Sequence, residues 1–520
     1  MRNLPIILVL FFLFGCNEQS KRNLRPNVIF IYADDLGRGM LSCYGQEIVE
    51  TPHIDQLATE GVRFDNVYGC MFCAPARASL LTGYHDVHAD KWQITSGGAY
   101  KKAFSGEISS GEISAAIAKQ TEVSEAEKII TLAEVFKKAG YITGQVGKLE
   151  WGFSTSFEEM QQHGWDYYYG YLDHVMAHGF YPPYMYENGK KVDVEGNTRQ
   201  DCGKTKERET AETYADRWNM EGKAQYSQDL FLEKILAFIR ENKDQPFFLF
   251  HPTQLPHGPV AIPEVHVDFV KDERLTQIEK EYASMVKMLD DHVGIIVQEL
   301  QKLGLEDNTI IIFSSDNGHE IYYSQEGRIL KPVRNMQTGE RFDNITTKFY
   351  SEIGGDVFDG NNGMAGLKYN NWEGGLRVPL IVKWAGVAPR NKSADNLVAN
   401  YDLLTTFADL LGVELPERKD GISLLPIWTG EDMTVEHDYT VNASMQGATI
   451  ITKEGWKLRH HYPKDVFQLY YLPDDYREEK DLAGEFPEKV EELKRVLIKE
   501  CNGDLANGHF TYGKFVLSKN

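Results

Sequence analysis

The chain has 520 residues, of which 42% are hydrophobic and 25% are charged, and its formal net charge at pH 7 is −22. This composition is typical of folded globular proteins and argues against wholesale disorder, and the length predicts a large domain with a smaller one, or two domains of moderate size. The negative charge argues against nucleic acid as a partner, because phosphate backbones bind to clustered Lys and Arg.

The N-terminus predicts an export signal. Arg2 gives a basic start, and the apolar run Leu4–Phe14 is too short to span a bilayer as a stable helix. Cys16 and a polar stretch follow, a pattern that resembles a bacterial lipoprotein signal with cleavage before Cys16 and a lipid on its sulfur. We expect residues 1–22 to be a signal and tether, and the protein to lie in the periplasm or at the outer-membrane surface, with plain secretion as the alternative.

Apolar runs rich in β-branched and aromatic residues predict buried strands, because strands covered on both faces read as continuous apolar stretches. The predicted strands are Val28–Tyr32, Tyr141–Val146, Phe247–Phe250, Thr309–Phe313 and Val378–Val382. Helical spacing lies between them, over Asp55–Glu60, Ile130–Ala139, Ser227–Glu241 and Gln277–Leu303. The alternation predicts an α/β fold over residues 23–435, a large, mixed and mostly parallel sheet sandwiched by helices.

The C-terminal part has a different pattern. Short strand-like pieces at Ala448–Thr452, Trp456–His461 and Gln468–Tyr471 precede an amphipathic helix at Pro487–Glu500. We expect residues 436–520 to form a small subdomain of antiparallel strands with a helix. The polar, poorly periodic stretch Tyr322–Gly360 predicts an insertion or a loop near the functional site.

Two acidic pairs follow two of the predicted strands. Asp34 and Asp35 come after the first strand, and Asp316 and Asn317 come after the fourth. In open α/β sheets ligands gather at the carboxyl ends of strands, and oxygen ligands suit a hard cation such as Ca²⁺ or Mg²⁺. A solvated turn is the alternative for either pair alone, and Asn at 317 argues against a two-zinc phosphatase site, which would need imidazole there.

The stretch Cys73–Gly83 predicts a helix that begins near a cysteine. Cys73 and Arg77 are four residues apart and share one face, while Pro75 suits the first helical position and Gly83 the end. Backbone N–H groups, the helix dipole and a guanidinium then form an anion cradle beside a sulfur. A buried cysteine in an ordinary helix is the alternative for this motif taken alone.

Six stretches occur together in chain order: Asn27–Gly37, Thr51–Ala58, Cys73–Gly83, Gly147-Lys148, Ser315–Gly318 and Trp372–Pro379. Together they resemble type I sulfatases of the alkaline phosphatase superfamily. In that family the cysteine of a C-x-P-x-R core is oxidised after translation to formylglycine, and one Ca²⁺ is bound. The resemblance therefore implies an alkaline phosphatase-like fold and formylglycine at Cys73. Ala76 replaces the commoner serine, but the core is intact.

The resemblance also implies roles for individual residues. The Ca²⁺ ligands it implies are Asp34, Asp35, Asp316, Asn317 and residue 73. Arg77 and Lys148 would stabilise charge on the sulfate and on the hydrated formyl group, Lys368 would bind the sulfate, and His257 would donate a proton to the leaving oxygen or contact the sulfate.

The modification has a chemical logic. A formyl group hydrates to a geminal diol, and one hydroxyl attacks sulfur. The second hydroxyl lets the resulting sulfate ester collapse to the aldehyde and expel sulfate. An unmodified cysteine has no such hydroxyl and cannot release sulfate in this way. Function therefore depends on a formylglycine-generating maturation enzyme as a partner.

Substrate contacts are predicted from residues 167–183, a region dense in aromatic and histidine side chains that resembles a substrate-side segment of carbohydrate sulfatases. His174, His178 and His319 are the substrate-binding candidates, with packed aromatic clusters as the alternative. Glu150 stands where several sulfatases carry a histidine. Glu150 is therefore a further candidate. It would act either as a base on the hydrated formyl group or as a partner of the substrate's hydroxyls or of a neighbouring Arg, and its role stays open.

The sequence thus predicts a sulfatase, a sulfuric ester hydrolase, that acts on a sulfated carbohydrate. The alternatives are a phosphatase or phosphonate monoester hydrolase of the same superfamily, and an inactive sulfatase-like lipoprotein that binds glycans. The sugar, the sulfated position, endo or exo action and the oligomeric state stay open, as do disulfides among Cys43, Cys70, Cys202 and Cys501.

Overall fold

The computed structural model describes residues 25–88, 99–104, 106–113, 129–150, 154–174, 176–198, 212, 219–326, 330–343, 345–433 and 435–510. The predicted signal and tether and Cys202 lie outside the described residues. Among the helices that are described, none is both long enough and apolar enough to cross a membrane. The cysteines in these ranges (Cys43, Cys70, Cys73 and Cys501) carry free thiols.

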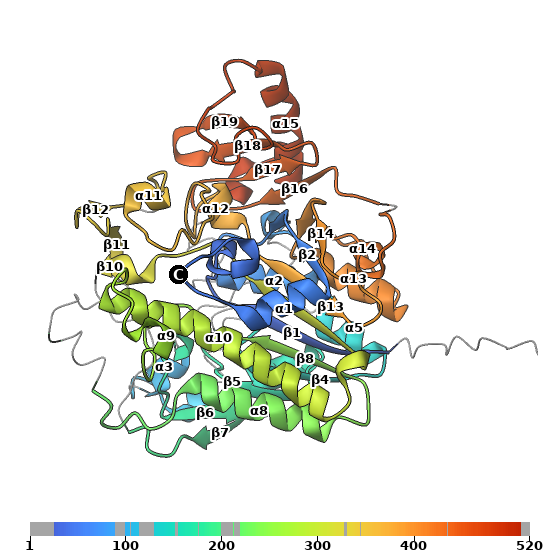
Figure 1. The fold of residues 1–520 in the computed structure, drawn as a ribbon. Coiled ribbons are helices and arrows are strands. Elements are labelled where there is room, and N and C mark those ends of the chain that lie inside the picture. Colours follow the sequence, from blue (N-terminus) through green and yellow to red (C-terminus); the bar gives the residue numbers. More distant parts are fainter. Residues whose placement is uncertain are drawn as a thin grey trace, which may run out of the picture.

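A ten-stranded sheet runs through the main domain, with the strand order β14-β2-β13-β9-β1-β8-β4-β5-β6-β7 (Figure 1). Five neighbouring strands are parallel: β9 (Thr309–Ser315), β1 (Asn27–Ala33), β8 (Phe247–Pro252), β4 (Ile142–Gly147) and β5 (Tyr167–Gly170). β13 (Leu380–Trp384) pairs antiparallel with β9, and the flanking strands are β2 (Val62–Phe64), β14 (Lys392–Ala394), β6 (Tyr184–Glu187) and β7 (Lys190–Asp193). The prediction of a mixed, mostly parallel sheet is confirmed.

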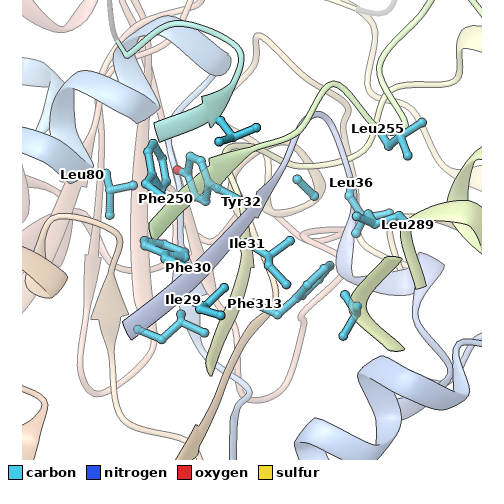
Figure 2. Packing of buried hydrophobic residues seen from close by; sticks show 14 of the residues in the cluster. Ile29, Phe30, Ile31, Tyr32, Leu36, Leu80, Phe250, Leu255, Leu289 and Phe313 are labelled. Carbon is cyan, nitrogen blue, oxygen red and sulfur yellow. The ribbon is translucent and has the colours of Figure 1, made fainter. Parts of the chain in front are cut away.

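Helices cover both faces of this sheet. α2 (Cys73–Thr82), α5 (Leu132–Lys138) and α13 (Asp402–Leu411) contact one another, and α10 (Gln277–Lys302) contacts α1 (Pro52–Glu60) and α8 (Ser227–Glu241). Figure 2 shows Leu80 of α2 on the side of β1 that carries Phe30, and Leu289 of α10 on the side that carries Ile31. Every residue of β1 is buried, as expected for a strand covered on both faces.

The C-terminal part forms a separate sheet, which Figure 1 shows at the red end of the chain. β16 (Tyr439–Asn442), β17 (Thr449–Thr452), β18 (Trp456–His461) and β19 (Val466–Tyr471) are antiparallel in that order, and α15 (Pro487–Glu500) contacts β17 and β18. The predicted small antiparallel subdomain with a helix is confirmed, whereas its boundary at residue 436 stays a prediction.

Shorter elements connect these layers. They are β3 (Val67–Tyr68), α3 (Ala99–Phe104), α6 (Phe157–Gln162), α9 (Val267–Val270), β10 (Gln325–Glu326), β11 (Leu330–Arg334), β12 (Arg341–Phe342), α11 (Ser351–Gly354), α12 (Glu373–Leu376), β15 (Val398–Ala399) and α14 (Leu425–Thr429). The stretch Tyr322–Gly360, predicted as a loop, therefore contains three short strands, a 3₁₀ turn at Tyr322–Ser324 and the helical turn α11 among its described residues.

Candidate active site

The two acidic pairs meet at one end of the parallel strands. Ala33, the last residue of β1, lies opposite Ser315, the last residue of β9, so the residues that follow each strand are neighbours. The backbone N–H of Asp35 donates to Asp316 Oδ1 over 2.9 Å, and Asn317 Nδ2 donates to Asp35 Oδ1 over 2.8 Å. The structure thus brings together the side chains that the sequence predicts as metal ligands.

Asp35 adopts a backbone conformation that non-glycine residues rarely occupy. Its φ is 63°, in the left-handed region. Such strain costs about 1–3 kcal/mol and persists where surrounding interactions hold it. Here the hydrogen bonds to Asp316 and Asn317 hold the Asp35 backbone and carboxylate.

Cationic side chains surround these carboxylates. Arg77, on α2, places Nη2 at 3.6 Å from Asp34 Oδ2 and 3.9 Å from Asp316 Oδ2, while its Nη1 donates to the carbonyl of Leu149. Lys148, which follows β4, donates from Nζ to Asp34 Oδ2. Because every one of these charges is buried, the pairs act in a low-dielectric environment where their attraction is strong.

Three further side chains converge on Asp35 Oδ2. Lys368 Nζ donates to this oxygen over 2.7 Å, the hydroxyl of Tyr322 also donates to it, and His257 Nε2 lies 3.3 Å away. Lys368 and His257 are predicted from the sequence, whereas Tyr322 is not. It falls in the stretch predicted as a loop, and its position shortly after the Asp316-Asn317 pair is the only signal that points to it.

The charges of the cluster set the pKa values of its acids. Burial alone would raise the pKa of Asp34, but Lys148 and Arg77 outweigh it and hold that pKa below its ordinary value. For Asp316, burial and then the negative charges of Asp34 and Asp35 raise the pKa well above its ordinary value. Additional positive charge beside Asp316 is therefore favourable, which a bound divalent cation would supply.

The oxygens that remain unpaired fit such a cation. Asp34 Oδ1, Asp316 Oδ2 and Asn317 Oδ1 are buried and have no hydrogen-bond partner among the described residues. Asp34, Asp316 and Cys73 each offer a ligand atom, and these atoms lie within 4.8 Å of one another. Since buried polar atoms are normally satisfied and Ca²⁺ takes carboxylate and amide oxygens, the donor set fits Ca²⁺.

Cys73 lies at the first residue of α2 and is buried. Burial raises the pKa of its thiol to about 11, with Lys148 opposing and Asp34 adding to the shift. The unmodified side chain is therefore a neutral thiol at pH 7, which is a weak nucleophile. Its Sγ lies 3.4 Å from His174 Nε2.

A row of histidine rings leads from Cys73 to the carboxylates. The ring centroids of His174 and His178 are 4.6 Å apart, and those of His178 and His257 are 4.5 Å apart. Gln254 holds the turn that carries His178, since its Nε2 donates to the carbonyls of Ala177 and Gly179. The structure thus brings two of the predicted substrate-side histidines to the cluster.

The other two substrate-side candidates are placed differently. Glu150 accepts hydrogen bonds from His163 Nδ1 and Trp165 Nε1, two residues that follow α6. Both of its carboxylate oxygens are therefore bonded to these side chains rather than to the charged residues around Asp34 and Asp35. His319 packs beside Tyr282, and its Nε2 lies 3.1 Å from the hydroxyl of Tyr323. Burial lowers the pKa of His319 to about 4, so this ring is neutral at pH 7.

Two family models match the chain. The model described as sulfatase matches residues 26–413, and the model described as N-sulphoglucosamine sulphohydrolase, C-terminal, matches residues 367–503. The first covers the main domain and every residue of the cluster described above. The second covers the C-terminal sheet and α15.

Individual proteins are similar over most of the chain. An N-acetylgalactosamine-6-O-sulfatase of Bacteroides thetaiotaomicron is 29% identical over 95% of this chain and 98% of its own length. Human N-acetylgalactosamine-6-sulfatase is 28% identical over 77% of this chain and 65% of its own length. A solved structure described under the metabolism of multiple glycosaminoglycans by Bacteroides thetaiotaomicron has a TM-score of 0.66 and 26% identity, and covers 92% of this chain and 100% of that chain.

Proposed function

Since the chain belongs to the sulfatase family, its reaction is the hydrolysis of sulfate esters, and we propose that it removes sulfate from a carbohydrate by means of a formylglycine at position 73 and one Ca²⁺. The observation that carries this proposal is the convergence of Cys73, Arg77 and the two acidic pairs. Ligand atoms of Asp34, Asp316 and Cys73 lie within 4.8 Å of one another, and Asp34, Asp316 and Asn317 each have a buried oxygen without a hydrogen-bond partner among the described residues. Similarity to sulfatases of N-acetylgalactosamine 6-sulfate supports a carbohydrate substrate.

The charge balance of the cluster supports an anionic substrate. Three buried carboxylates (Asp34, Asp35 and Asp316) face three buried cations (Arg77, Lys148 and Lys368). Asp34, Asp35, Asp316 and Asn317 would hold the Ca²⁺, which when bound supplies positive charge beside the sulfate and the nucleophilic oxygen. The centre then carries an excess of positive charge, which attracts the monoanionic sulfate ester.

The cationic side chains would bind and orient the sulfate. Arg77 has a buried Nη2 without a hydrogen-bond partner among the described residues, so a guanidinium donor is available for a sulfate oxygen. Lys148 and Lys368 are held by Asp34 and Asp35, which fixes each ammonium group at the edge of the centre. Preorganised donors of this kind stabilise the charge that develops in the transition state.

His257 would donate a proton to the leaving ester oxygen. Its Nδ1 donates to the carbonyl of Gly258, so Nε2 is the nitrogen that faces the site. Nε2 lies 3.3 Å from Asp35 Oδ2 and 3.4 Å from Lys368 Nζ, so this nitrogen stands between a carboxylate and an ammonium group at the centre. A protonated Nε2 can then transfer its proton as the bond between sulfur and the ester oxygen breaks.

The nucleophile depends on oxidation of Cys73. Formylglycine supplies, in its hydrated form, the oxygen that attacks sulfur. The position at the first residue of α2 places that oxygen at the positive end of the helix. A formylglycine-generating maturation enzyme is therefore a proposed partner in the cell.

Two measurements test the proposal together. We expect release of sulfate from at least one member of a panel of defined sulfated mono- and disaccharides, and no release of phosphate from matched phosphate esters. Mass spectrometry of the tryptic peptide that bears residue 73 should reveal formylglycine in protein from the native host. Preferential phosphate release would favour a phosphatase or phosphonate monoester hydrolase, and an unconverted thiol with glycan binding but no turnover would favour an inactive receptor.

We also propose that the protein is a lipoprotein of the periplasm or outer-membrane surface. The proposal rests on the sequence of residues 1–22 alone, which end in a polar stretch after Cys16. Labelling with radioactive palmitate should mark the wild type and not Cys16→Ser. Equal labelling of both proteins would contradict the proposed site of attachment.

A further inference from the structure

The side chain of Gln254 reaches from the end of a central strand to the 3₁₀ turn that carries His178. Gln254 follows the last residue of β8 by two positions and is 1% exposed. Its Nε2 donates to the carbonyl of Ala177 over 2.7 Å and to the carbonyl of Gly179 over 2.8 Å. Ala177 and Gly179 are the two neighbours of His178 in the chain, so one amide group holds the backbone on both sides of this histidine.

The oxygen of the same amide is held by the start of helix α8. Ser227 Oγ and Gln228 Nε2 each donate to Gln254 Oε1 over 2.7 Å, and Thr253 Oγ1 donates to Gln228 Oε1 over 2.7 Å. A side-chain amide has two N–H donors and an oxygen that accepts two hydrogen bonds, so every one of these positions is used in Gln254. Because all four side chains are buried, this network fixes the direction in which the Gln254 amide points.

The backbone next to this amide is tied to the sulfatase centre. The N–H of His257 donates to the carbonyl of Gln254 over 2.8 Å, and the N–H of Asp34 donates to the carbonyl of Leu255 over 3.0 Å. Gln254 therefore joins the turn of His178 to the segment that carries His257, the proposed proton donor.

The ring of His178 lies between two other rings of the site. Its centroid is 4.6 Å from that of His174 and 4.5 Å from that of His257, and His174 Nε2 lies 3.4 Å from Cys73 Sγ. Since these buried rings are closely packed, a movement of the His178 backbone would disturb its contacts with both neighbours.

Other hydrogen bonds reach the turn from one side. The hydroxyl of Tyr171 donates to the carbonyl of Gly179 over 2.8 Å, and the N–H of Ser227 donates to the carbonyl of Phe180 over 2.8 Å. Both carbonyls follow His178 in the chain. Gln254 adds a bond to the carbonyl that precedes His178, so the turn is held on both sides of the ring.

We propose that Gln254 is a positioning residue that fixes His178 beside His257 and thereby sets how the sugar of the substrate is recognised. This inference rests on the proposed function, because it takes His178 as a contact for the sulfated carbohydrate. Arg77, Lys148 and Lys368 are held by carboxylates rather than by this network. Loss of the Gln254 amide should therefore weaken binding of the sugar more than it slows the chemical step.

A double-mutant cycle tests whether Gln254 acts through His178. On the saccharide that the wild type cleaves best, Gln254→Met should raise KM about tenfold and leave kcat within about threefold of the wild type. The double variant with His178→Ala should be no worse than His178→Ala alone, because the same contact is lost only once. Gln228→Met is the matched control: it alters a buried glutamine of the same network whose side chain makes no hydrogen bond to the turn within the described part of the chain, and KM should stay within about twofold of the wild type.

Hydrogen exchange measured by mass spectrometry gives a second readout that does not depend on turnover. Amides of residues 176–180 should exchange about tenfold faster in Gln254→Met than in the wild type, and at the wild-type rate in Gln228→Met. Should Gln254→Met fold poorly, Gln254→Glu takes its place, since it keeps the accepting oxygen and lacks the N–H donors.

Unchanged exchange in the Gln254 variant overturns the proposal, as does an effect on KM that adds to that of His178→Ala. Faster exchange with an unchanged KM would also overturn it, because the turn would then move without affecting the sugar. A wild type that releases no sulfate from any saccharide would count against the proposed function instead, and the exchange rates would still show whether Gln254 holds the turn.

Discussion

Two buried groups of charges in this molecule contain the same kinds of side chain but satisfy them differently. In the first, at the junction with the C-terminal subdomain, Glu373 accepts hydrogen bonds on both carboxylate oxygens, from Lys457 over 2.8 Å and from Arg377 over 2.7 Å. Lys457 also lies 3.0 Å from Glu478 Oε1. We call this group (Glu373, Arg377, Lys457 and Glu478) the junction ion cluster.

The second group is the sulfatase centre, where two of the acids have an oxygen without a hydrogen bond. Asp34 Oδ1 and Asp316 Oδ2 have no hydrogen-bond partner within the described part of the chain. Lys457 and Arg377 outweigh burial and lower the pKa of Glu373 to about 2, whereas burial raises the pKa of Glu478 and, with neighbouring carboxylates, raises the pKa of Asp316 well above its ordinary value.

Glu478 Oε1 also lacks a hydrogen bond to any described residue but lies 3.0 Å from the Lys457 ammonium group, whereas the sulfatase centre brings the ligand atoms of Asp34, Asp316 and Cys73 within 4.8 Å of one another. The gathering of several open ligand atoms, rather than burial or the number of charges, therefore distinguishes the binding centre from the structural one.

Removing the nucleophile should have the largest effect on turnover at the sulfatase centre. Cys73→Ala should lower turnover on the order of 10⁴-fold or more, because no other group can form the bond to sulfur. The melting temperature should stay within a few degrees of the wild type. Cys70→Ala is the matched control, a buried cysteine three residues away that lies outside the centre and should leave turnover intact. Wild-type turnover by Cys73→Ala would remove Cys73 from the mechanism.

Neutralising Asp316, a carboxylate with an unpaired oxygen, should separate Ca²⁺ binding from stability. Asp316→Asn should lower turnover about 10²–10³-fold and abolish the rise in melting temperature that Ca²⁺ produces in the wild type, because an anionic ligand is lost. Without Ca²⁺ the variant should be at least as stable as the wild type, since a buried charge with an unpaired oxygen is removed. Asp356→Asn, a buried acid bonded to Tyr323 and Ser351, is the control that should retain the Ca²⁺ response.

Neutralising an acid of the junction ion cluster should destabilise the protein, unlike the neutralisation of Asp316. Glu373→Gln should lower the free energy of unfolding by about 3 kcal/mol, because it leaves Lys457 and Arg377 buried without their shared anion. Denaturant unfolding measures the loss, and Asp438→Asn, in an exposed pair with Lys453, should change nothing. A Glu373→Gln protein as stable as the wild type would show that the two hydrogen bonds of Glu373 with Lys457 and Arg377 do not stabilise the fold.

A smaller effect is expected at the residue that the sequence did not predict. Tyr322→Phe removes the hydroxyl that donates to Asp35 and should lower turnover about 10- to 100-fold, since one hydrogen bond to a charged group is worth about 1.5–3 kcal/mol. The neighbouring Tyr323→Phe removes a bond to Asp356 instead and should leave turnover unchanged. Equal losses in both variants would mean that Tyr322 acts through the fold rather than through Asp35.

Much of the fold follows from local patterns in the sequence. The helix predicted over Ser227–Glu241 is observed with those bounds, and the first and fourth predicted strands are β1 and β9, lengthened by one or two residues. Their apolar runs and polar ends also place the acidic pairs correctly, because parallel strands end at one edge of the sheet. Local sequence patterns are therefore sufficient to predict strands such as β1 and β9, which are buried along their whole length.

Contacts that join distant residues are not predictable in the same way. The flanking strands β2 and β14 have three residues each, too few for a periodic signal, and β14 is largely exposed. The pairing of Tyr322 with Asp35 and of Glu500 with His85 depends on tertiary packing, which no spacing in the chain encodes. The orientation of Glu150 toward His163 has the same origin.

The smallest effect is expected at the Glu150–His163 pair, because the His163 side chain is 31% exposed while the Glu150 carboxylate is buried and also accepts a hydrogen bond from Trp165. Glu150 outweighs burial and raises the pKa of His163, so the folded protein binds this proton more tightly than the unfolded chain. The stability that the pair contributes is therefore present below the unfolded pKa of about 6.5 and is lost as pH rises through the higher folded pKa. His163→Gln should lower the free energy of unfolding at pH 6 by about 1 kcal/mol and by less at pH 9, as measured in urea.

Glu150→Gln should reproduce that pH dependence if the pair is the cause. His251→Gln is the contrasting variant: burial lowers the pKa of His251 to about 4, so the wild type loses stability there as pH falls from about 6.5 toward 4, and the variant should lose less. An unchanged pH dependence in both Glu150→Gln and His163→Gln would mean that the two side chains do not form an ion pair. Glu150 would then be free to turn toward the substrate, as the sequence allows, and the carboxylate would belong with the sulfatase centre rather than with its support.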